Sequence, residues 1–308
     1  MQQIKIFSPA SVSNVCCGFD VLGFSIEGIG DELIISKSKF SGVKIKKVNG
    51  YDVPNDELKN TASIAGNALL DYLEIDQGFE IQIHKKIKPG SGIGSSASSA
   101  VGSVFGINKL LGNPMKLDDL IQFAMKGEFF SSKSAPADNV ASALHGGLIL
   151  VNNHEGFKVT KLPVPENLYA IVHHPLIEIK TSDSRNVLPE KISLDIASNQ
   201  LASIGGFIHS LHTDDFNLMK ASLKDFLVEE HRSNYIPCFK DIKTAALENG
   251  AICCSISGSG PSIFTLVNGY TKSVEVKFII NKIYDKKQIE FNSYTTSLNA
   301  RGVHEIQN

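Results

Sequence analysis

The glycine- and serine-rich run at residues 89–99, PGSGIGSSASS, constrains what this chain can fold into more than any other stretch. It follows an alternating polar and apolar segment at 79–84, which predicts a strand, and it leads into residues 97–111, whose apolar spacing predicts a helix. Glycines let a backbone approach a ligand closely, and a helix N-terminus presents N–H groups that suit an anion. The sequence therefore predicts a phosphate-binding turn, in which serine hydroxyls add donors and candidate Mg²⁺ ligands.

Two familiar phosphate-binding patterns do not fit this run. Walker A requires a lysine directly after its last glycine, whereas Ser95 follows Gly94 here. The dinucleotide-binding fingerprint requires glycines at its first, third and sixth positions, but Gly90 and Gly92 are followed by Ser95 at the sixth. A loop that only makes a tight turn remains the structural alternative.

Composition limits the class of protein. The chain has 308 residues, of which 42% are hydrophobic and 20% charged, and its net charge is −2. This profile is typical of a folded protein large enough for two domains, and it gives no electrostatic reason to bind nucleic acid or an anionic membrane. The first ten residues lack the features of a signal peptide, and no long apolar run occurs, so we expect a cytoplasmic protein without a membrane helix. The five cysteines fit neither a disulfide framework nor a zinc site, and we expect them to be reduced and buried.

Hydrophobic periodicity predicts a mixed order of strands and helices. Strands are expected at residues 3–8, 32–38, 42–47, 79–84, 146–151, 168–173, 251–257, 262–267 and 289–294, and helices at 61–73, 97–111, 117–130, 194–211, 239–248 and 274–283. Because several neighbouring strands resemble hairpins, this order favours an α+β fold over a doubly wound parallel sheet. The polar stretch at 152–166 is the best candidate for a domain junction, which predicts domains at 1–160 and 161–308.

Two acidic residues outside the loop are candidates for a site. Asp20 lies between two apolar residues in a loop of small and polar residues that also contains Asn14, although a carboxylate there also fits a turn or helix cap. Glu128 follows Ser96 by 32 residues. Alone it would be a solvated side chain, but beside a phosphate loop it is a candidate Mg²⁺ ligand.

The arginines are also informative, because only three of the 30 basic residues are arginine. They are Arg185, Arg232 and Arg301. A chain that otherwise uses lysine can place arginine where a planar, bidentate donor is needed for a carboxylate or a phosphate. The alternative for each of the three is an ordinary cation at the protein surface.

Three segments together resemble the GHMP small-molecule kinases. Residues 88–97, KPGSGIGSSA, resemble the second motif of that family, PxxxGLGSSA, with proline one place later and Ile93 in place of leucine. Residues 257–262, SGSGPS, resemble the third motif. Residues 9–23 resemble the first motif of the homoserine kinases within this family, PATSANLGxGFDxLG. The motifs occur in the family's order and span most of the chain, so we identify it as a member that is most similar to the homoserine kinases.

This resemblance implies a fold and a set of site residues. The fold is the two-domain GHMP kinase fold, with an N-terminal domain like the second domain of ribosomal protein S5 and a ferredoxin-like C-terminal domain. The resemblance also implies that ATP and L-homoserine are the substrates and that the protein is a homodimer. ATP is expected at Lys88, Pro89, Gly90, Ser91, Gly92, Ile93, Gly94, Ser95, Ser96, Ala97 and Ser98. L-Homoserine is expected at Asn14, Asp20, Asn139, Arg185 and Arg232, with Asp20 facing its ammonium group, and Mg²⁺ at Ser96 and Glu128.

The resemblance also bears on catalysis, for which Asn139, Arg185 and Glu128 are the expected residues. Mevalonate kinases place a catalytic aspartate seven residues before a Gly-Gly pair, and here that position is Asn139. An amide cannot accept a proton at neutral pH, so we expect phosphoryl transfer without a dedicated base, with the neighbouring Asp138 as the rival candidate. Pro136 replaces a histidine that is usual in the family. A mevalonate-type or sugar kinase, or a non-catalytic member of the family, remains the alternative function.

Overall fold

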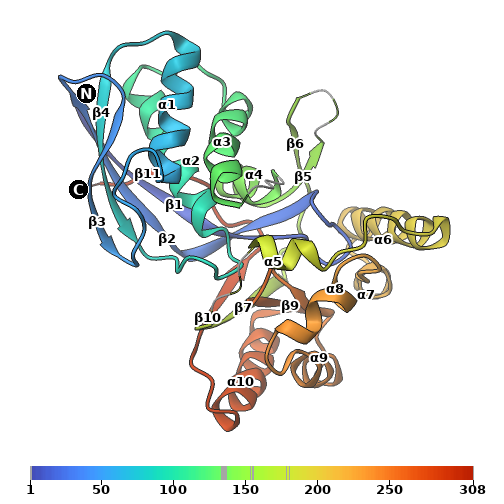
Figure 1. Ribbon diagram of the computed structural model, residues 1–308. Helices are drawn as coiled ribbons and strands as arrows, with labels where there is room; N and C mark the ends of the chain where they lie inside the picture. The colour runs from blue at the N-terminus through green and yellow to red at the C-terminus, as the bar shows by residue number, and fades with distance from the viewer. Residues whose placement is uncertain are drawn as a thin grey trace.

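The computed structural model describes residues 2–132, 137–152, 154, 156–177, 179 and 181–307. It contains two β-sheets, each covered by helices, and Figure 1 shows the first sheet with α1, α2 and α3 above the second sheet with α9 and α10. Nearly all strand pairs are antiparallel, and the pairing of β3 with β4 is parallel. The α+β class expected from the sequence is confirmed.

The first sheet has the strand order β11-β1-β2-β4-β3, and β5 and β6 extend from β2. Its strands are β1 (Gln3–Ser13), β2 (Leu22–Ser38), β3 (Val43–Gly50), β4 (Gly78–Lys85), β5 (Leu148–Asn152), β6 (Lys158–Lys161) and β11 (His304–Glu305). Leu33 and Ile35 of β2 and Ile81 and Ile83 of β4 alternate with more exposed residues and are buried under the helices. This alternation follows from the two-residue repeat of a strand, which points successive side chains to opposite faces.

Four helices and one 3₁₀ turn cover that face: α1 (Thr61–Leu73), α2 (Ser95–Leu110), η1 (Asp118–Leu120), α3 (Ile121–Ser132) and α4 (Asp138–His145). The helix α2 lies in close contact with the sheet. A Cβ atom added at Gly102 would lie 2.6 Å from Leu33, and one added at Gly106 would lie 2.4 Å from Ile35. Glycine at these two positions therefore allows α2 to pack closely on β2, which fixes the position of the loop that precedes it.

The second sheet has the order β10-β7-β9-β8. It consists of β7 (Leu168–Pro175), β8 (Cys253–Ile256), β9 (Ile263–Asn268) and β10 (Phe291–Ser297). One face packs on α9 (Phe239–Glu248) and α10 (Tyr270–Lys286). The other face shares a core with residues of β1 and β2 and with α6 (Leu194–Thr213) and α7 (Phe216–Ser222). Three short elements lie in the connections of this half of the chain. The helix α5 (Thr181–Asn186) lies between β7 and α6, and α8 (Glu229–Arg232) and η2 (Ser233–Tyr235) lie between α7 and α9 in the sequence.

The positions of the expected elements are close to those observed, with some corrections. The helices expected at 61–73 and 239–248 have those bounds, whereas α2 begins at Ser95, two residues earlier than expected. The polar stretch at 152–166 contains the strand β6, which pairs with β5. Residues 304–305 lie on the first sheet as β11, beside β1. The division of the chain into domains at residue 160 stays a prediction.

The end of α4 is joined to a segment far away in the sequence. The N–H of Val303 donates to the carbonyl of Ala143, and the N–H of Gly147 donates to the carbonyl of Ala300. Gly146 has a φ of 69°, and a Cβ atom there would lie 2.1 Å from the nitrogen of Gly302. The two segments therefore pack backbone against backbone.

Two further expectations from the sequence can be compared with the structure. All five cysteines are free thiols, and all except Cys238 are buried. In the part of the chain that the structure describes, no helix combines the length and the apolar character needed to cross a membrane.

The core shared by the two sheets leads to a prediction. Phe264 of β9 is fully buried, and its ring packs edge-on against that of Phe24 of β2, with centroids 5.9 Å apart. We expect Phe264→Ala to lower the free energy of unfolding by about 3–5 kcal/mol in urea denaturation, because it leaves a cavity between the sheets. The control Phe278→Ala removes a ring that is 58% exposed on α10, and it should change that free energy by less than about 0.5 kcal/mol. Equal effects of the two substitutions would contradict a shared core.

Candidate active site

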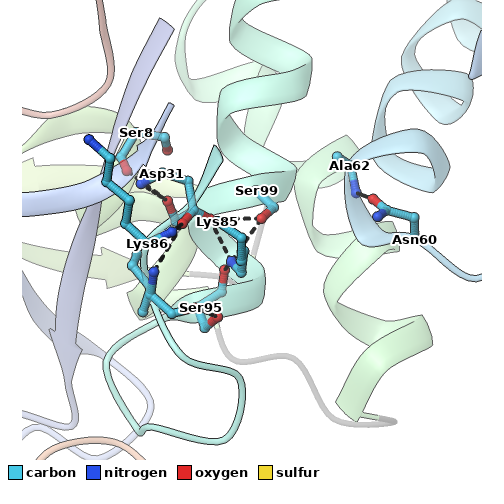
Figure 2. Close-up of polar contacts among 10 residues, drawn as sticks. Ser8, Asp31, Asn60, Ala62, Lys85, Lys86, Ser95 and Ser99 are labelled. Atoms are coloured by element: carbon cyan, nitrogen blue, oxygen red, sulfur yellow. Dashed lines mark hydrogen bonds and ion pairs between the residues drawn. The ribbon is translucent and has the colours of Figure 1, made fainter. Parts of the chain in front are cut away.

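A cavity of about 420 Å³ lies at the N-terminus of α2, where residues from both halves of the chain meet. Most of the residues predicted for a site line it: Asn14, Asp20, Pro89, Gly90, Ser91, Gly92, Gly94, Ser95, Ser96, Glu128, Asn139, Arg185 and Arg232. Residues near the start of α1 line it as well, among them Asn60, whose side chain caps that helix by accepting from the N–H of Ala62 (Figure 2). Pro136 lies outside the described residues.

The glycine-rich loop before α2 lines this cavity and is anchored to the protein through its backbone carbonyls. The carbonyls of Gly90, Ser91, Gly92 and Ile93 each accept a hydrogen bond from elsewhere in the protein: from the N–H of Ile179, the N–H and hydroxyl of Ser262, the hydroxyl of Ser257 and the N–H of Ser11. In a trans peptide the N–H points away from the carbonyl. The N–H groups of residues 91–94 therefore point away from these supports.

The conformation of the loop depends on glycine. Gly90, Gly92 and Gly94 have φ angles of 68°, 77° and 68°. Gly94 caps α2 without a side-chain hydrogen bond to the first turn. The loop thus ends at a helix N-terminus whose N–H groups and dipole favour an anion.

Four of the residues predicted to bind ATP do not line the cavity. The ammonium group of Lys88 donates a hydrogen bond of 2.7 Å to the carbonyl of Leu176, and the hydroxyl of Ser98 donates one of 2.7 Å to the carbonyl of Ser8. Ile93 and Ala97 are buried in the apolar core. These side chains hold the loop and α2 in place.

Ser96 of α2 and Glu128 of α3 lie together at the edge of the loop. Burial raises the pKa of Glu128 to about 7, although the Ser96 hydroxyl, as a hydrogen-bond donor, and the nearby charge of Lys85 both lower it. A hydroxyl and a carboxylate are oxygen donors of the kind that Mg²⁺ prefers, so the pair fits the predicted metal site.

Asp20 and Arg185 form an ion pair with each other. Arg185 donates to both carboxylate oxygens of Asp20, from Nη1 at 3.0 Å and from Nη2 at 2.6 Å. Both side chains remain partly exposed, at 25% and 36%. The two residues predicted to bind opposite ends of an amino acid are thus partners in this structure.

Arg232 lies beside this pair and is almost completely buried. Its guanidinium group donates to the carbonyl of Ser184 at 2.9 Å and to the carbonyl of Gly258 at 2.8 Å. Burial and the nearby positive charge of Arg185 lower the pKa of Arg232 to about 10, so it stays cationic near neutral pH. The ring of Phe19 lies next to both guanidinium groups, with centroid distances of 5.3 Å and 5.9 Å.

Asp138 connects the two asparagines predicted to bind substrate. One of its carboxylate oxygens accepts from the N–H of Asn14 at 3.1 Å, and the other accepts from the N–H of Asn139 at 2.9 Å. Burial, together with the negative charge of Asp20, raises the pKa of Asp138 to about 7. Asp138 is fully buried, and it is absent from the lining of the cavity.

The side chains of the two asparagines already have protein partners. Asn14 has a left-handed backbone, with a φ of 67°; its amide group donates to the carbonyl of Gly258 and accepts from the N–H of Asp20. Asn139 accepts from the hydroxyl of Ser11 at 2.8 Å and donates to the hydroxyl of Ser13 at 2.9 Å. Both amides are therefore held in fixed orientations at the wall of the cavity.

Sequence reasoning missed Lys85, which lines the cavity from the end of β4. Lys85 and Asp31 form an ion pair of 2.5 Å, and their side chains are 2% and 0% exposed. A signal for both residues was present in the sequence. Every second residue of these two strands is buried. Asp31 stands in the same buried series as Leu33 and Ile35, and Lys85 stands in the same series as Ile81 and Ile83. A charged residue at a core position on each of two strands indicates a buried pair.

The loop geometry leads to a second prediction. A Cβ atom at Gly92 would lie 2.5 Å from the backbone oxygen of Gly260, whereas one at Gly28, which has a similar φ of 79°, would meet nothing within 4 Å. We expect Gly92→Ala to weaken ATP binding about tenfold or more in titration calorimetry, because the loop must shift. Gly28→Ala imposes the same backbone strain, about 1–2 kcal/mol, and should leave ATP binding unchanged. Equal ATP affinity in both variants would contradict this role of the loop.

Comparison with known proteins agrees with the geometry of the cavity. The model of the GHMP kinases N-terminal domain matches residues 58–147, and that of the GHMP kinases C-terminal domain matches residues 207–286. The homoserine kinase of Chlorobium phaeobacteroides (strain BS1) is 40% identical over 276 residues, which cover 86% of each chain. That of Thermoplasma acidophilum is 32% identical over 293 residues, which cover 94% of this chain and 93% of the relative.

Solved structures give the same result. The crystal structure of homoserine kinase from Cytophaga hutchinsonii is similar over 99% of this chain and 98% of that one, with a TM-score of 0.95 and 45% identity. The mevalonate kinase of L. major has a TM-score of 0.68 at 16% identity, over 95% of each chain, and shares the fold. The two family models match both halves of the sequence, and the relatives match nearly its whole length. The chain therefore belongs to the GHMP kinase family.

Proposed function

We propose that this protein transfers the γ-phosphate of ATP to the side-chain hydroxyl of L-homoserine, which gives O-phospho-L-homoserine and ADP, a step of threonine biosynthesis. One observation carries the proposal: a phosphate-binding loop and a set of groups suited to an amino acid line the same cavity. The relatives named homoserine kinase, at 32–40% identity over most of the chain, support this choice of substrate.

The phosphate donor would lie against the loop. The N–H groups of residues 91–94 and the first turn of α2 would bind its phosphate oxygens, because these donors are directed outward by the hydrogen-bonded carbonyls behind them. Ser96 and Glu128 would hold Mg²⁺, since they are adjacent oxygen donors at the edge of the loop. Mg²⁺, when bound, neutralises negative charge on the phosphate oxygens during transfer.

The acceptor amino acid would bind at the Asp20–Arg185 pair. A zwitterion carries one carboxylate and one ammonium group, so it offers a replacement partner to each member: its carboxylate to Arg185 and its ammonium group to Asp20. Arg232 would add a second cation for the carboxylate, from a position fixed by two backbone carbonyls. Asn14 and Asn139 would orient the bound molecule.

The surroundings of Asp138 favour transfer without a dedicated base. Both oxygens of Asp138 accept backbone N–H groups, and the residue does not line the cavity. A loose phosphoryl-transfer transition state needs little activation of the nucleophile, so positioning and charge neutralisation can provide most of the rate acceleration. The hydroxyl proton would leave late in the reaction, to the transferred phosphate.

Three further proposals come from the sequence and from its resemblance to the family. The protein would act in the cytoplasm and bind no nucleic acid, as its composition leads us to expect, and it would assemble as a homodimer, as the family resemblance implies. Light scattering of the purified protein tests the homodimer directly.

Substrate choice gives a third prediction. In a coupled assay of ADP release with Mg-ATP, we expect turnover largely confined to L-homoserine among L-homoserine, L-serine, L-threonine, mevalonate and galactose. Asp20→Asn should raise KM for L-homoserine about 10- to 100-fold, because the ammonium group loses its charged partner, and should leave KM for ATP unchanged. The control Glu190→Gln removes an exposed carboxylate from a second pocket that Arg185 also lines, and it should leave both KM values unchanged. Turnover of mevalonate or a sugar instead would contradict the proposal.

Asp138 gives a fourth prediction, because a base with a pKa of about 7 would make kcat fall tenfold per pH unit below pH 7. We expect wild type and Asp138→Asn to have pH profiles of kcat with the same shape. Asp138→Asn should lose activity, since its amide can accept from only one of the two N–H groups, but Asn139→Ala should lose more. A fall of kcat below pH 7 in wild type that disappears in a folded Asp138→Asn variant would identify Asp138 as the base.

A further inference from the structure

The buried Asp31–Lys85 ion pair lies directly beneath the phosphate loop and has no role in the reaction described above. Asp31 comes from β2 and Lys85 from the end of β4, one residue beyond the paired Glu32 and His84. Removing two charges from water costs several kcal/mol each, and replacing a buried pair by apolar residues is often neutral or stabilising. Stability of the fold alone therefore does not account for this pair.

Asp31 holds the beginning of the loop. Its Oδ1 accepts from the backbone N–H of Lys86 at 3.0 Å and from that of Ile87 at 3.2 Å. Its Oδ2 accepts from Lys85 Nζ at 2.5 Å and from the hydroxyl of Ser99 at 2.8 Å. The carboxylate thus fixes the direction in which the chain leaves β4.

Lys85 holds the end of the loop. Its Nζ donates to the backbone oxygen of Ser95 at 2.5 Å and to the hydroxyl of Ser99 at 2.9 Å, as Figure 2 shows. The Ser95 hydroxyl in turn donates to the carbonyl of Ile87 at 2.9 Å. An ammonium group has three N–H donors, and with Asp31 all three have acceptors within the protein. Lys85 therefore acts on the loop and keeps no donor for a ligand.

We propose that Asp31 and Lys85 are positioning residues that hold the two ends of the loop at a fixed separation and thereby set its affinity for the phosphate donor. The loop between Ile87 and Ser95 must bring several N–H groups to one point, and flexible ends would make this convergence costly in entropy. A rigid base shared by β4 and α2 removes that cost before the ligand binds. The inference rests on the proposed function only in assigning the loop to a phosphate donor.

The chain offers a matched control in the residue that follows each member of the pair. Lys86 and Glu32 also form an ion pair, but their side chains are 50% and 21% exposed, and Glu32 pairs with Lys5 as well. Exposed pairs of this kind contribute little to stability. Lys86→Met and Glu32→Gln remove the same kinds of charge one residue further along the chain.

The experiment measures ATP binding by titration calorimetry without an acceptor, and KM for ATP and for L-homoserine separately. We expect Asp31→Asn and Lys85→Met to weaken ATP binding at least about tenfold, while KM for L-homoserine stays within twofold. Ser99→Ala should weaken ATP binding less, and both control variants should match wild type. ATP binding by folded Asp31→Asn and Lys85→Met at wild-type affinity would overturn the proposal.

A double variant separates positioning from stability and covers the case in which single variants do not fold. Asp31→Asn combined with Lys85→Met leaves no unpaired charge and keeps a side-chain oxygen for the N–H groups of Lys86 and Ile87, so it should melt at a higher temperature than either single variant. It should still bind ATP at least about tenfold more weakly than wild type. Wild-type ATP affinity in this variant would overturn the proposal. If ATP affinity falls in the variants as expected but wild type does not turn over L-homoserine, the proposed function is wrong and the inference about the loop stands. Absence of ATP binding by wild type would overturn both.

Discussion

Four consecutive carbonyls of the glycine loop are hydrogen-bonded to the protein behind them, and the rest of the site depends on this arrangement. The donors come from Ser11 in the first half of the chain and from Ile179, Ser257 and Ser262 in the second. Because peptide units are planar and trans, satisfying the carbonyls on one side leaves the N–H groups facing the other. The loop can present these donors only when both halves are folded and packed, which explains why the shared core between the two sheets matters for the cavity.

Two ion pairs at the site differ in burial. The partly exposed pair is suited to exchange partners with a ligand, and the buried pair is suited to support the loop. Asp20 and Arg185 are partly exposed and line the cavity, so solvent or a zwitterion can compete for each of them. Asp31 and Lys85 are nearly or fully excluded from solvent and have all of their polar atoms in use. Breaking such a pair is far more costly than breaking an exposed one. The Asp20–Arg185 pair can therefore exchange partners, whereas the Asp31–Lys85 pair is a fixed support of the loop.

The local part of the fold and the nature of the loop could be predicted from the sequence. The bounds of α1 agreed with its apolar spacing and with the capping residue Asn60. The strand β6 was missed because its four residues are mostly polar and exposed, so no alternation identifies them. The pairing of Asp20 with Arg185 joins residues 165 positions apart, and periodicity carries no information at that range. Lys85 was missed because lysine at a strand end is normally solvated, and only its phase with the buried isoleucines indicated otherwise.

The junction between α4 and residues 300–303 has a consequence for biosynthesis. The helix that carries Asn139 ends at His145, and the next residue, Gly146, packs against a segment that the ribosome makes more than 150 residues later. The helix α4 and the edge strand β11 therefore cannot reach their final packing while the chain is still short. The nascent N-terminal half would emerge with the edge of β1 unpaired and the wall of the cavity incomplete. Competence to bind both substrates would then arise only after residue 303 has been made, and a fragment released before that point would be a client for chaperones or proteases without being a partial enzyme.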